Sequence, residues 1–257
     1  MIKLVNIKME YDKKVVLDNI NLTVTSGETV AIIGPSGSGK STLLRLMVGL
    51  TKPSAGEIWI ENEEISQYKE NALNKVRLKM GMVFQYSALF DFLSVGENVA
   101  FGLRQHTKLS NKEIQAIVNE KLRVVGLVGK EDFMPNQLSG GMKKRVSLAR
   151  AIAINPQIIL YDEPTAGLDP IMSAKIDKTI MNTQKIIGGV SVVVTHNMAS
   201  AFAIADRIIM IYEGKIIAEG STAAIKESDN DIVQKFIVDY KNIKQLVHEN
   251  EVLEIED

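Results

Sequence analysis

The 257-residue sequence contains no cysteine, and only 5% of its residues are aromatic. The absence of cysteine excludes disulfide bonds and thiolate metal sites, and it permits a reducing compartment. The sequence also lacks an excess of either charge, because 30 Lys and Arg residues are balanced by 31 Asp and Glu residues. A nucleic-acid-binding protein normally carries a basic surplus on one face, so we expect no nucleic-acid partner.

Long hydrophobic runs are missing too, and no stretch approaches the roughly 20 apolar residues that span a bilayer. Residues 1–10 alternate apolar and polar side chains and then become charged, which is typical of a strand and not of a signal peptide. The overall content of 46% hydrophobic residues is ample for a globular core. We therefore expect a chain that is soluble by itself and is linked to a membrane only through a partner.

Short apolar segments alternate with helical patterns, which predicts an α/β fold with a mainly parallel sheet. Residues 29–33 form a continuous apolar run before a glycine-rich loop, as a buried parallel strand does, and a helix should follow from Lys40 to about Gly49. Ser110, with Glu113 three residues later, predicts a capped helix over residues 111–125. Further strands are expected at residues 4–9, 20–24, 58–60, 80–84, 158–161 and 191–195, with turns at Asp18-Asn19 and Ser26-Gly27 and a hairpin formed by 207–212 and 215–219 around Glu213-Gly214.

Two additions to this core are expected: an antiparallel β lobe near the N-terminus and a helical lobe over about residues 87–154. Residues 1–240 would form one domain, followed by an acidic tail over 241–257. The last stretch places four apolar side chains on one helical face. This face could pack on its own domain, or on a second protomer or another subunit. The four residues are Phe236, Tyr240, Ile243 and Val247.

Residues 34–41, Gly-Pro-Ser-Gly-Ser-Gly-Lys-Ser, match the pattern G-x-x-x-x-G-K-[ST] between a predicted strand and a predicted helix. The glycines let backbone N–H groups converge on phosphate oxygens at a helix N-terminus. A lysine at the end of the loop supplies a positive charge for the β and γ phosphates, and the next hydroxyl can bind Mg²⁺. A chance glycine-rich turn is the alternative, which the strand and helix context disfavours. The candidate nucleotide-binding residues are Gly34, Ser36, Gly37, Gly39, Lys40, Ser41 and Thr42.

Two acids, Asp162 and Glu163, end the apolar segment 158–161. In phosphate-loop enzymes an aspartate at such a strand end holds Mg²⁺, and the next carboxylate can act as a general base toward water. Because ligands bind at the carboxyl edge of parallel sheets, both acids are expected at the nucleotide site. The alternative is a helix N-cap followed by a solvated acid.

Residues 138–142, Leu-Ser-Gly-Gly-Met, complete a set of motifs that resembles the ATP-binding-cassette (ABC) ATPases, whose signature is L-S-G-G-Q. The resemblance covers nearly the whole chain, with all the motifs in the expected order. It implies a P-loop NTPase (RecA-like) fold and an ATPase that uses ATP and Mg²⁺. The motifs are Tyr11, the phosphate loop, Gln85, the signature, Asp162-Glu163, residues 166–169 and His196.

The resemblance assigns the signature to a second copy of the chain. Ser139, Gly140 and Gly141 would bind the ATP held by the other protomer, so that a head-to-tail homodimer encloses two nucleotides. Asp169 resembles the residue that couples the two sites across the dimer.

Three further residues take roles from the same resemblance. Tyr11 would stack on adenine, and Gln85 would contact Mg²⁺ and the attacking water and sense the transmembrane partner. His196 would donate a hydrogen bond to the γ-phosphate. The alternatives are a packing residue for Tyr11, a polar strand end for Gln85 and a structural histidine for His196.

Met142 occupies the signature position at which most relatives have glutamine. This residue and the segments 84–90, 97–100 and 103–107 resemble one subgroup of the family. This subgroup is the ATPases of Mla-type phospholipid transport systems, which are associated with MCE (mammalian-cell-entry) proteins. The resemblance implies transmembrane permease subunits, an MCE-type lipid-binding subunit, and a peripheral position on the cytoplasmic face of the inner membrane. The transport would be linked to outer-membrane lipid asymmetry. Another transporter, or a non-transport ABC complex in cell division or on nucleic acid, is the alternative, and the signature argues against a P-loop kinase.

Overall fold

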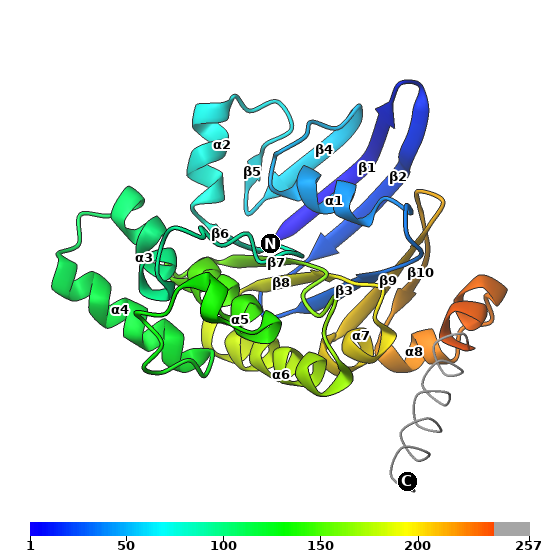
Figure 1. The fold of residues 1–257 in the computed structure, drawn as a ribbon. Coiled ribbons are helices and arrows are strands. Elements are labelled where there is room, and N and C mark those ends of the chain that lie inside the picture. Colours follow the sequence, from blue (N-terminus) through cyan, green and yellow to red (C-terminus); the bar gives the residue numbers. More distant parts are fainter. Residues whose placement is uncertain (239–257) are drawn as a thin grey trace, which may run out of the picture.

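The computed structural model describes residues 1–238, and its centre is a six-stranded sheet (Figure 1). The strand order is β10-β9-β3-β8-β7-β6, in which only β10 is antiparallel to its neighbour. The expectation of a mainly parallel sheet is therefore confirmed. The strands are β3 (Thr29–Ile33), β6 (Met80–Val83), β7 (Ile158–Asp162), β8 (Val190–Val194), β9 (Arg207–Tyr212) and β10 (Lys215–Gly220).

Every residue of β3 and β8 is buried, because helices cover both faces of the central sheet. Side chains alternate between the faces, so Ile32 and Val192 join the core around α1 while Ile33 packs with residues of α7. In Figure 1, α1 lies between the central sheet and the second sheet, and α5, α6 and α7 cover the opposite face. The helices are α1 (Lys40–Met47), α5 (Gly140–Ile152), α6 (Pro170–Ile187), α7 (Met198–Ile204) and α8 (Thr222–Lys226).

The N-terminal lobe is an antiparallel sheet in the order β2-β1-β4-β5. The predicted turn at Asp18-Asn19 is wrong, because both residues lie inside β2 and the chain reverses at Asp12 and Lys13, whose φ angles are 48° and 67°. The register against β1 shifts between Ile7 and Met9, opposite these residues, so Asn19 takes a φ of 53° without ending the strand. The strands are β1 (Ile2–Tyr11), β2 (Lys14–Val24), β4 (Ala55–Ile60) and β5 (Glu63–Glu64).

Helices α3, α4 and α5 pack together as the expected helical lobe at one end of the central sheet (Figure 1). The predicted cap at Ser110 is present as a capping box, in which Ser110 and Glu113 each accept a hydrogen bond from the other's backbone N–H. Ser94 and Glu97 form a second capping box that the sequence analysis did not identify. The remaining elements are α2 (Glu70–Arg77), α3 (Val95–His106), α4 (Asn111–Val124) and the short 3₁₀ helix η1 (Pro135–Gln137).

Residues 231–238 form a helix that packs on its own domain. Val233 and Ile237 are buried in the core that contains β3 and α7, and Phe236 packs against this core. The other apolar positions of this face, at 240, 243 and 247, and the predicted tail over 241–257 lie outside the described residues. No helix within residues 1–238 has the length and apolar character of a bilayer span.

One buried acid, Asp177, lies on α6 and contacts Ser200 of α7. Asp177 is 7% exposed, and its Oδ1 has no hydrogen-bond partner within residues 1–238. Burial raises the pKa of Asp177 to about 6, although a hydrogen bond with the Ser200 hydroxyl opposes this shift. Ser200 lies 3.3 Å from the Thr165 hydroxyl, so α6, α7 and the start of the 166–169 loop meet at this buried cluster.

Asp177→Asn should stabilise the fold at neutral and basic pH. A raised folded-state pKa means that the stability contributed by Asp177 is present below its ordinary value of 3.8 and is lost as pH rises through about 6. Removing the charge should raise the free energy of unfolding by roughly 1–3 kcal/mol near pH 8 and change it little below about pH 4. Urea unfolding at both pH values checks this, and an equal gain at both would contradict a charge effect.

Candidate functional site

The phosphate loop connects β3 to α1, and two of its three glycines are required by close packing. A Cβ at Gly34, whose φ is 146°, would lie 2.1 Å from the Ile211 carbonyl oxygen. A Cβ at Gly39, whose φ is 105°, would lie 2.6 Å from Leu17 Cδ2. The loop is thus pressed against β2 and β9, which fixes the direction of its backbone N–H groups.

The loop borders a pocket of about 590 Å³ at the carboxyl edge of the central sheet. This edge is where parallel α/β sheets bind ligands. Nine of the predicted site residues line the pocket, so four separated segments of the sequence meet here. They are Ser36, Gly37, Gly39, Lys40, Ser41, Thr42, Gln85, Glu163 and His196.

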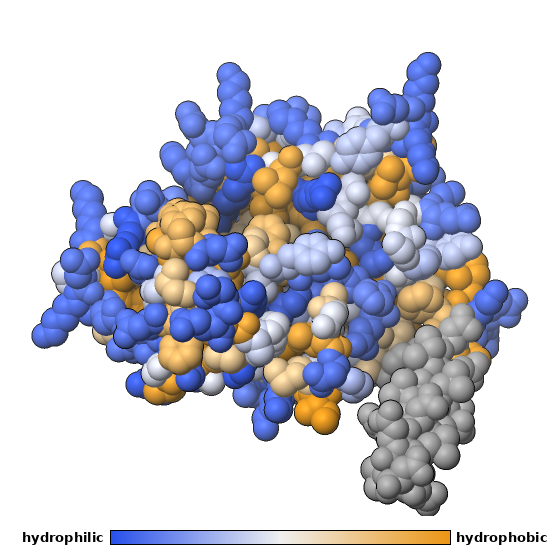
Figure 2. Space-filling view, viewed as in Figure 1, coloured by the Kyte–Doolittle hydropathy of each residue, from blue (hydrophilic) through white to orange (hydrophobic). Residues whose placement is uncertain are grey.

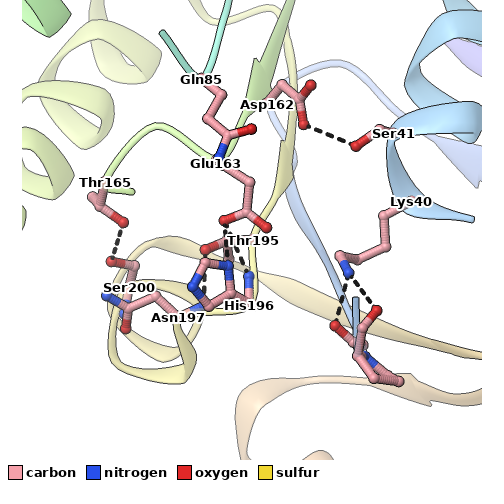
Figure 3. A network of polar contacts seen from close by, with 12 residues as sticks. Lys40, Ser41, Gln85, Asp162, Glu163, Thr165, Thr195, His196, Asn197 and Ser200 are labelled. Carbon is pink, nitrogen blue, oxygen red and sulfur yellow. Dashed lines mark hydrogen bonds and ion pairs between the residues drawn. The ribbon is translucent and has the colours of Figure 1, made fainter. Parts of the chain in front are cut away.

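Lys40 begins α1 and is 7% exposed. Its Nζ donates hydrogen bonds of 2.8 Å to the carbonyl oxygens of Gly34 and Pro35 (Figure 3). Burial lowers the pKa of Lys40, and the negative charges of Glu163 and Asp162 oppose that shift. An ammonium group is therefore held at the wall of the pocket by the carbonyl oxygens of its own loop.

Asp162 ends β7 and faces the first turn of α1. The Ser41 hydroxyl donates a hydrogen bond of 3.3 Å to Asp162 Oδ1. Burial raises the pKa of Asp162, and the hydrogen bond from Ser41 lowers it. Carboxylate and hydroxyl oxygens are ligands that Mg²⁺ prefers, so this pair fits a site for that ion beside phosphate oxygens. Residues 1–238 contain no cluster of three or more acidic or histidine side chains that could hold a metal. Phosphate oxygens would therefore have to supply part of the Mg²⁺ coordination at this pair.

Glu163 is held in an unusual backbone conformation. Its φ is 47°, in the left-handed region that costs a non-glycine residue about 1 kcal/mol or more, and its N–H donates a 2.9 Å hydrogen bond to the Val194 carbonyl. Its carboxylate Oε2 lies 2.9 Å from His196 Nδ1 and accepts a 3.3 Å hydrogen bond from the His196 N–H. Figure 3 shows the Gln85 amide pointing toward this carboxylate. The strained turn thus places Glu163, the residue after β7, at the wall of the pocket.

The loop after β8 fixes His196. The Asn197 N–H donates a 2.9 Å hydrogen bond to Thr195 Oγ1, and Asn197 Oδ1 caps α7 by accepting a 3.2 Å bond from the Ser200 N–H. The imidazole is 64% exposed, so it is not a core histidine.

The signature is displayed on a different surface. The Ser139 hydroxyl caps α5 by accepting a 3.3 Å hydrogen bond from the Met142 N–H, and Ser139 and Gly140 are exposed. Asp169 is exposed too and caps α6 through a 2.8 Å bond from the Met172 N–H. None of these residues, nor Tyr11, which is 43% exposed at the end of β1, lines the phosphate pocket.

Sequence reasoning missed three residues at the site. Val16 and Phe236 line the pocket from β2 and from the C-terminal helix, and Lys144 of α5 donates hydrogen bonds to the backbone of Gln85 and Glu163. Val16 lies in a strand without a motif, and the sequence pattern of Phe236 predicts only an apolar helical face. Lys144 lies in the basic run after the signature, and its contact with Glu163 spans 19 residues.

Comparison with known proteins gives the family of this chain. The family model described as "ABC transporter" matches residues 17–166. The chain belongs to the ABC transporter family. This chain is 41% identical over 237 residues to the intermembrane phospholipid transport system ATP-binding protein MlaF of Haemophilus influenzae. The aligned region covers 92% of this chain and 90% of that protein.

Two further relatives extend the similarity of this ABC ATPase. The chloroplastic protein TRIGALACTOSYLDIACYLGLYCEROL 3 of Arabidopsis thaliana is 41% identical over 243 residues, or 88% of this chain and 70% of that protein. A dimeric ATP-binding cassette, MJ0796, in a post-hydrolysis state with ADP and Pi, is 37% identical with a TM-score of 0.80, over 86% of this chain and 99% of that chain. The predictions of a P-loop NTPase fold, an ABC ATP-binding subunit and ATPase activity are confirmed.

Proposed function

We propose that this ABC ATPase binds MgATP in the phosphate pocket, hydrolyses it in a head-to-tail homodimer, and drives phospholipid transport between membranes through permease subunits. One observation carries the proposal. The side chains suited to hydrolysis surround one pocket, whereas the signature that should complete it is exposed elsewhere on the same chain. A second copy is therefore needed to bring a signature to the pocket.

In the proposed reaction, Tyr11 stacks on adenine and the amides of the loop from Gly34 to Gly39 bind the phosphates, with Thr42 beside them. Lys40 turns its ammonium from its own loop carbonyls toward the β and γ phosphates. Ser41, Gln85 and Asp162 would hold Mg²⁺, which when bound neutralises phosphate charge.

Hydrolysis then depends on the pair Glu163 and His196. Glu163 accepts a proton from the attacking water, in a carboxylate orientation that the His196 N–H already holds. The His196 ring is 64% exposed, so it has room to leave its contact with Glu163 Oε2 and to donate to the γ-phosphate. The backbone donors and Lys40 stabilise the charge that builds up on the transferring group.

In the proposed dimer, Ser139, Gly140 and Gly141 contact the triphosphate of the partner protomer, and Asp169 lies at the seam between the two sites. The N-terminus of α5 carries a partial positive charge that attracts the γ-phosphate. The dimeric state of the similar cassette supports this arrangement. With Met142 in place of the usual glutamine, the signature keeps its backbone N–H donors and loses only the contacts of the glutamine amide.

An exposed apolar surface beside Gln85 is the proposed docking site for a permease. Figure 2 shows hydrophobic patches over the helical lobe, among others on the same face. The rings of Phe90 and Phe101 pack with their centroids 4.6 Å apart, so Phe90 supports the exposed Phe101. We define this docking surface as Phe84, Tyr86, Phe92 and Phe101, which are 39%, 87%, 77% and 38% exposed. Docking here would place the chain peripherally on the cytoplasmic face of the inner membrane.

The substrate is proposed from the relatives. Both curated relatives reported above are 41% identical to this chain. The name of the bacterial relative states intermembrane phospholipid transport. An MCE-type lipid-binding subunit is the expected further partner.

The test is purification of the complex through a tag on this chain, followed by reconstitution into phospholipid vesicles. We expect permease and MCE-type subunits to co-purify, and the MCE-type subunit to release phospholipid in an ATP-dependent manner. Tyr86→Ser with Phe92→Ser should abolish co-purification without changing ATP affinity. Ile186→Ser, which alters a 62% exposed apolar residue of α6, is the matched control and should retain the complex. A complex that transports no phospholipid would overturn the substrate assignment.

A further inference from the structure

A buried lysine connects the signature helix to the centre of the phosphate site. Lys144 lies in the second turn of α5 and is 6% exposed. Its Nζ donates a hydrogen bond to the Gln85 carbonyl oxygen and one of 3.4 Å to the Glu163 carbonyl oxygen. Burying an ammonium group is costly unless it is hydrogen-bonded or paired, so these two carbonyl oxygens offset part of that cost.

The two carbonyls follow adjacent strands of the central sheet. Gln85 comes just after β6 and Glu163 just after β7, and these strands are parallel neighbours. Lys144 therefore spans the gap between the helical lobe and the core at the point where both strands end. Ser139, the N-cap of the same helix, lies five residues earlier.

The other basic residues of α5 have different partners. Arg145 donates to the carbonyls of Val125 and Gly126 within the helical lobe, and Arg150 donates to those of Ser87 and Ala88. Lys144 alone among them contacts the backbone of Glu163. Burial lowers the pKa of Lys144, and the charges of Glu163 and Asp162 oppose that shift, so the ammonium and the two carboxylates share one electrostatic environment.

We propose that Lys144 is a positioning residue for hydrolysis, which holds the Gln85 and Glu163 backbone and thereby ties the signature helix to the catalytic carboxylate of its own chain. Since the signature contacts the partner's nucleotide in the proposed dimer, this inference rests on the proposed function. The consequence is a mechanical link between the sites: a shift of α5 against one nucleotide moves Glu163 at the other. Glu163 is sensitive to such a shift because its backbone is already strained at a φ of 47°.

The first test compares three substitutions of Lys144 in the full chain. Lys144→Met removes both hydrogen bonds and should lower kcat by about tenfold or more, because small misplacements of catalytic groups have effects up to about a hundredfold. The KM and Kd for ATP should stay within about twofold, since Lys144 does not line the pocket. Lys144→Arg keeps a cationic donor and should retain more activity than Lys144→Gln. The half-buried neighbour Lys143 is the control, and Lys143→Met should keep the parent kcat.

The second test places the effect in one protomer. A limiting amount of active chain is mixed with an excess of Glu163→Gln chain, so that hydrolysis comes only from the Glu163 of the limiting chain. We expect Lys144→Met to lower the rate when it is in the limiting chain, and to have no effect when it is in the Glu163→Gln chain that lends its signature. The opposite pattern, or equal loss in both mixtures, would overturn the assignment.

Failure of this inference differs from failure of the dimer itself. If the excess Glu163→Gln chain never alters the rate of the limiting chain, the two copies do not share sites and the proposed function fails. If the excess chain does alter the rate, but Lys144→Met has the same effect in either chain, only the role of Lys144 is wrong.

Discussion

Glu163→Gln should leave ATP bound in a stable dimer while lowering kcat by about 10²- to 10⁴-fold, the range that general-base catalysis contributes. The amide is nearly isosteric with the carboxylate, so the pocket and the left-handed turn at residue 163 are retained. It cannot accept the proton of the attacking water. ATP, once enclosed, would therefore persist and hold the two chains together.

Sedimentation with ATP and single-turnover hydrolysis check this prediction. The parent chain should dissociate as ATP is consumed, and the Glu163→Gln chain should remain dimeric. Glu227→Gln, at an exposed glutamate after α8, makes the same chemical change far from the pocket and should behave like the parent. Hydrolysis by Glu163→Gln at the parent rate would remove Glu163 from the role of base.

The parts of the site that the sequence predicted are those in which neighbours along the chain suffice. The phosphate loop is one contiguous motif, and the buried strands β3 and β7 are continuous apolar runs because helices cover both of their faces. The capping box at Ser110 is likewise local. Contiguous motifs on such strands gave the positions of Lys40 and Glu163.

The parts that could not be predicted depend on distant contacts. Asp18-Asn19 has turn composition, yet its preference for a turn is overridden by the pairing of β2 with β1, which absorbs Asn19 as an irregularity. Phe236 enters the pocket only because residues 231–238 pack beside α7. The left-handed φ of Glu163 also could not be predicted, because no sequence pattern marks it and the surrounding hydrogen bonds impose it.

Gly140→Asp should block ATP-driven dimerisation without harming the free chain. Gly140 is the first residue of α5, and a Cβ there would meet only Leu168 Cδ2, at 3.5 Å, an ordinary contact. A carboxylate at a helix N-terminus is favoured by the helix dipole, so the fold should be at least as stable as the parent. The same charge would repel the γ-phosphate of the partner's ATP. Gly140→Ala, which adds the Cβ without the charge, is the control and should still dimerise.

Gly140→Asp can also reveal whether the active site is shared, when it is mixed with Lys40→Ala. Lys40→Ala should abolish hydrolysis and weaken ATP binding, because the loop loses the ammonium that Gly34 and Pro35 hold at the pocket. In a mixed dimer both defects fall in one site, and the other site combines an intact Lys40 with an intact Gly140. Two inactive chains should therefore recover activity on mixing, up to about one quarter of the parent rate, since about half of random pairs are mixed and each holds one intact site. If the mixture stays inactive although both chains are folded and Gly140→Asp alone binds ATP, each chain must complete its own site.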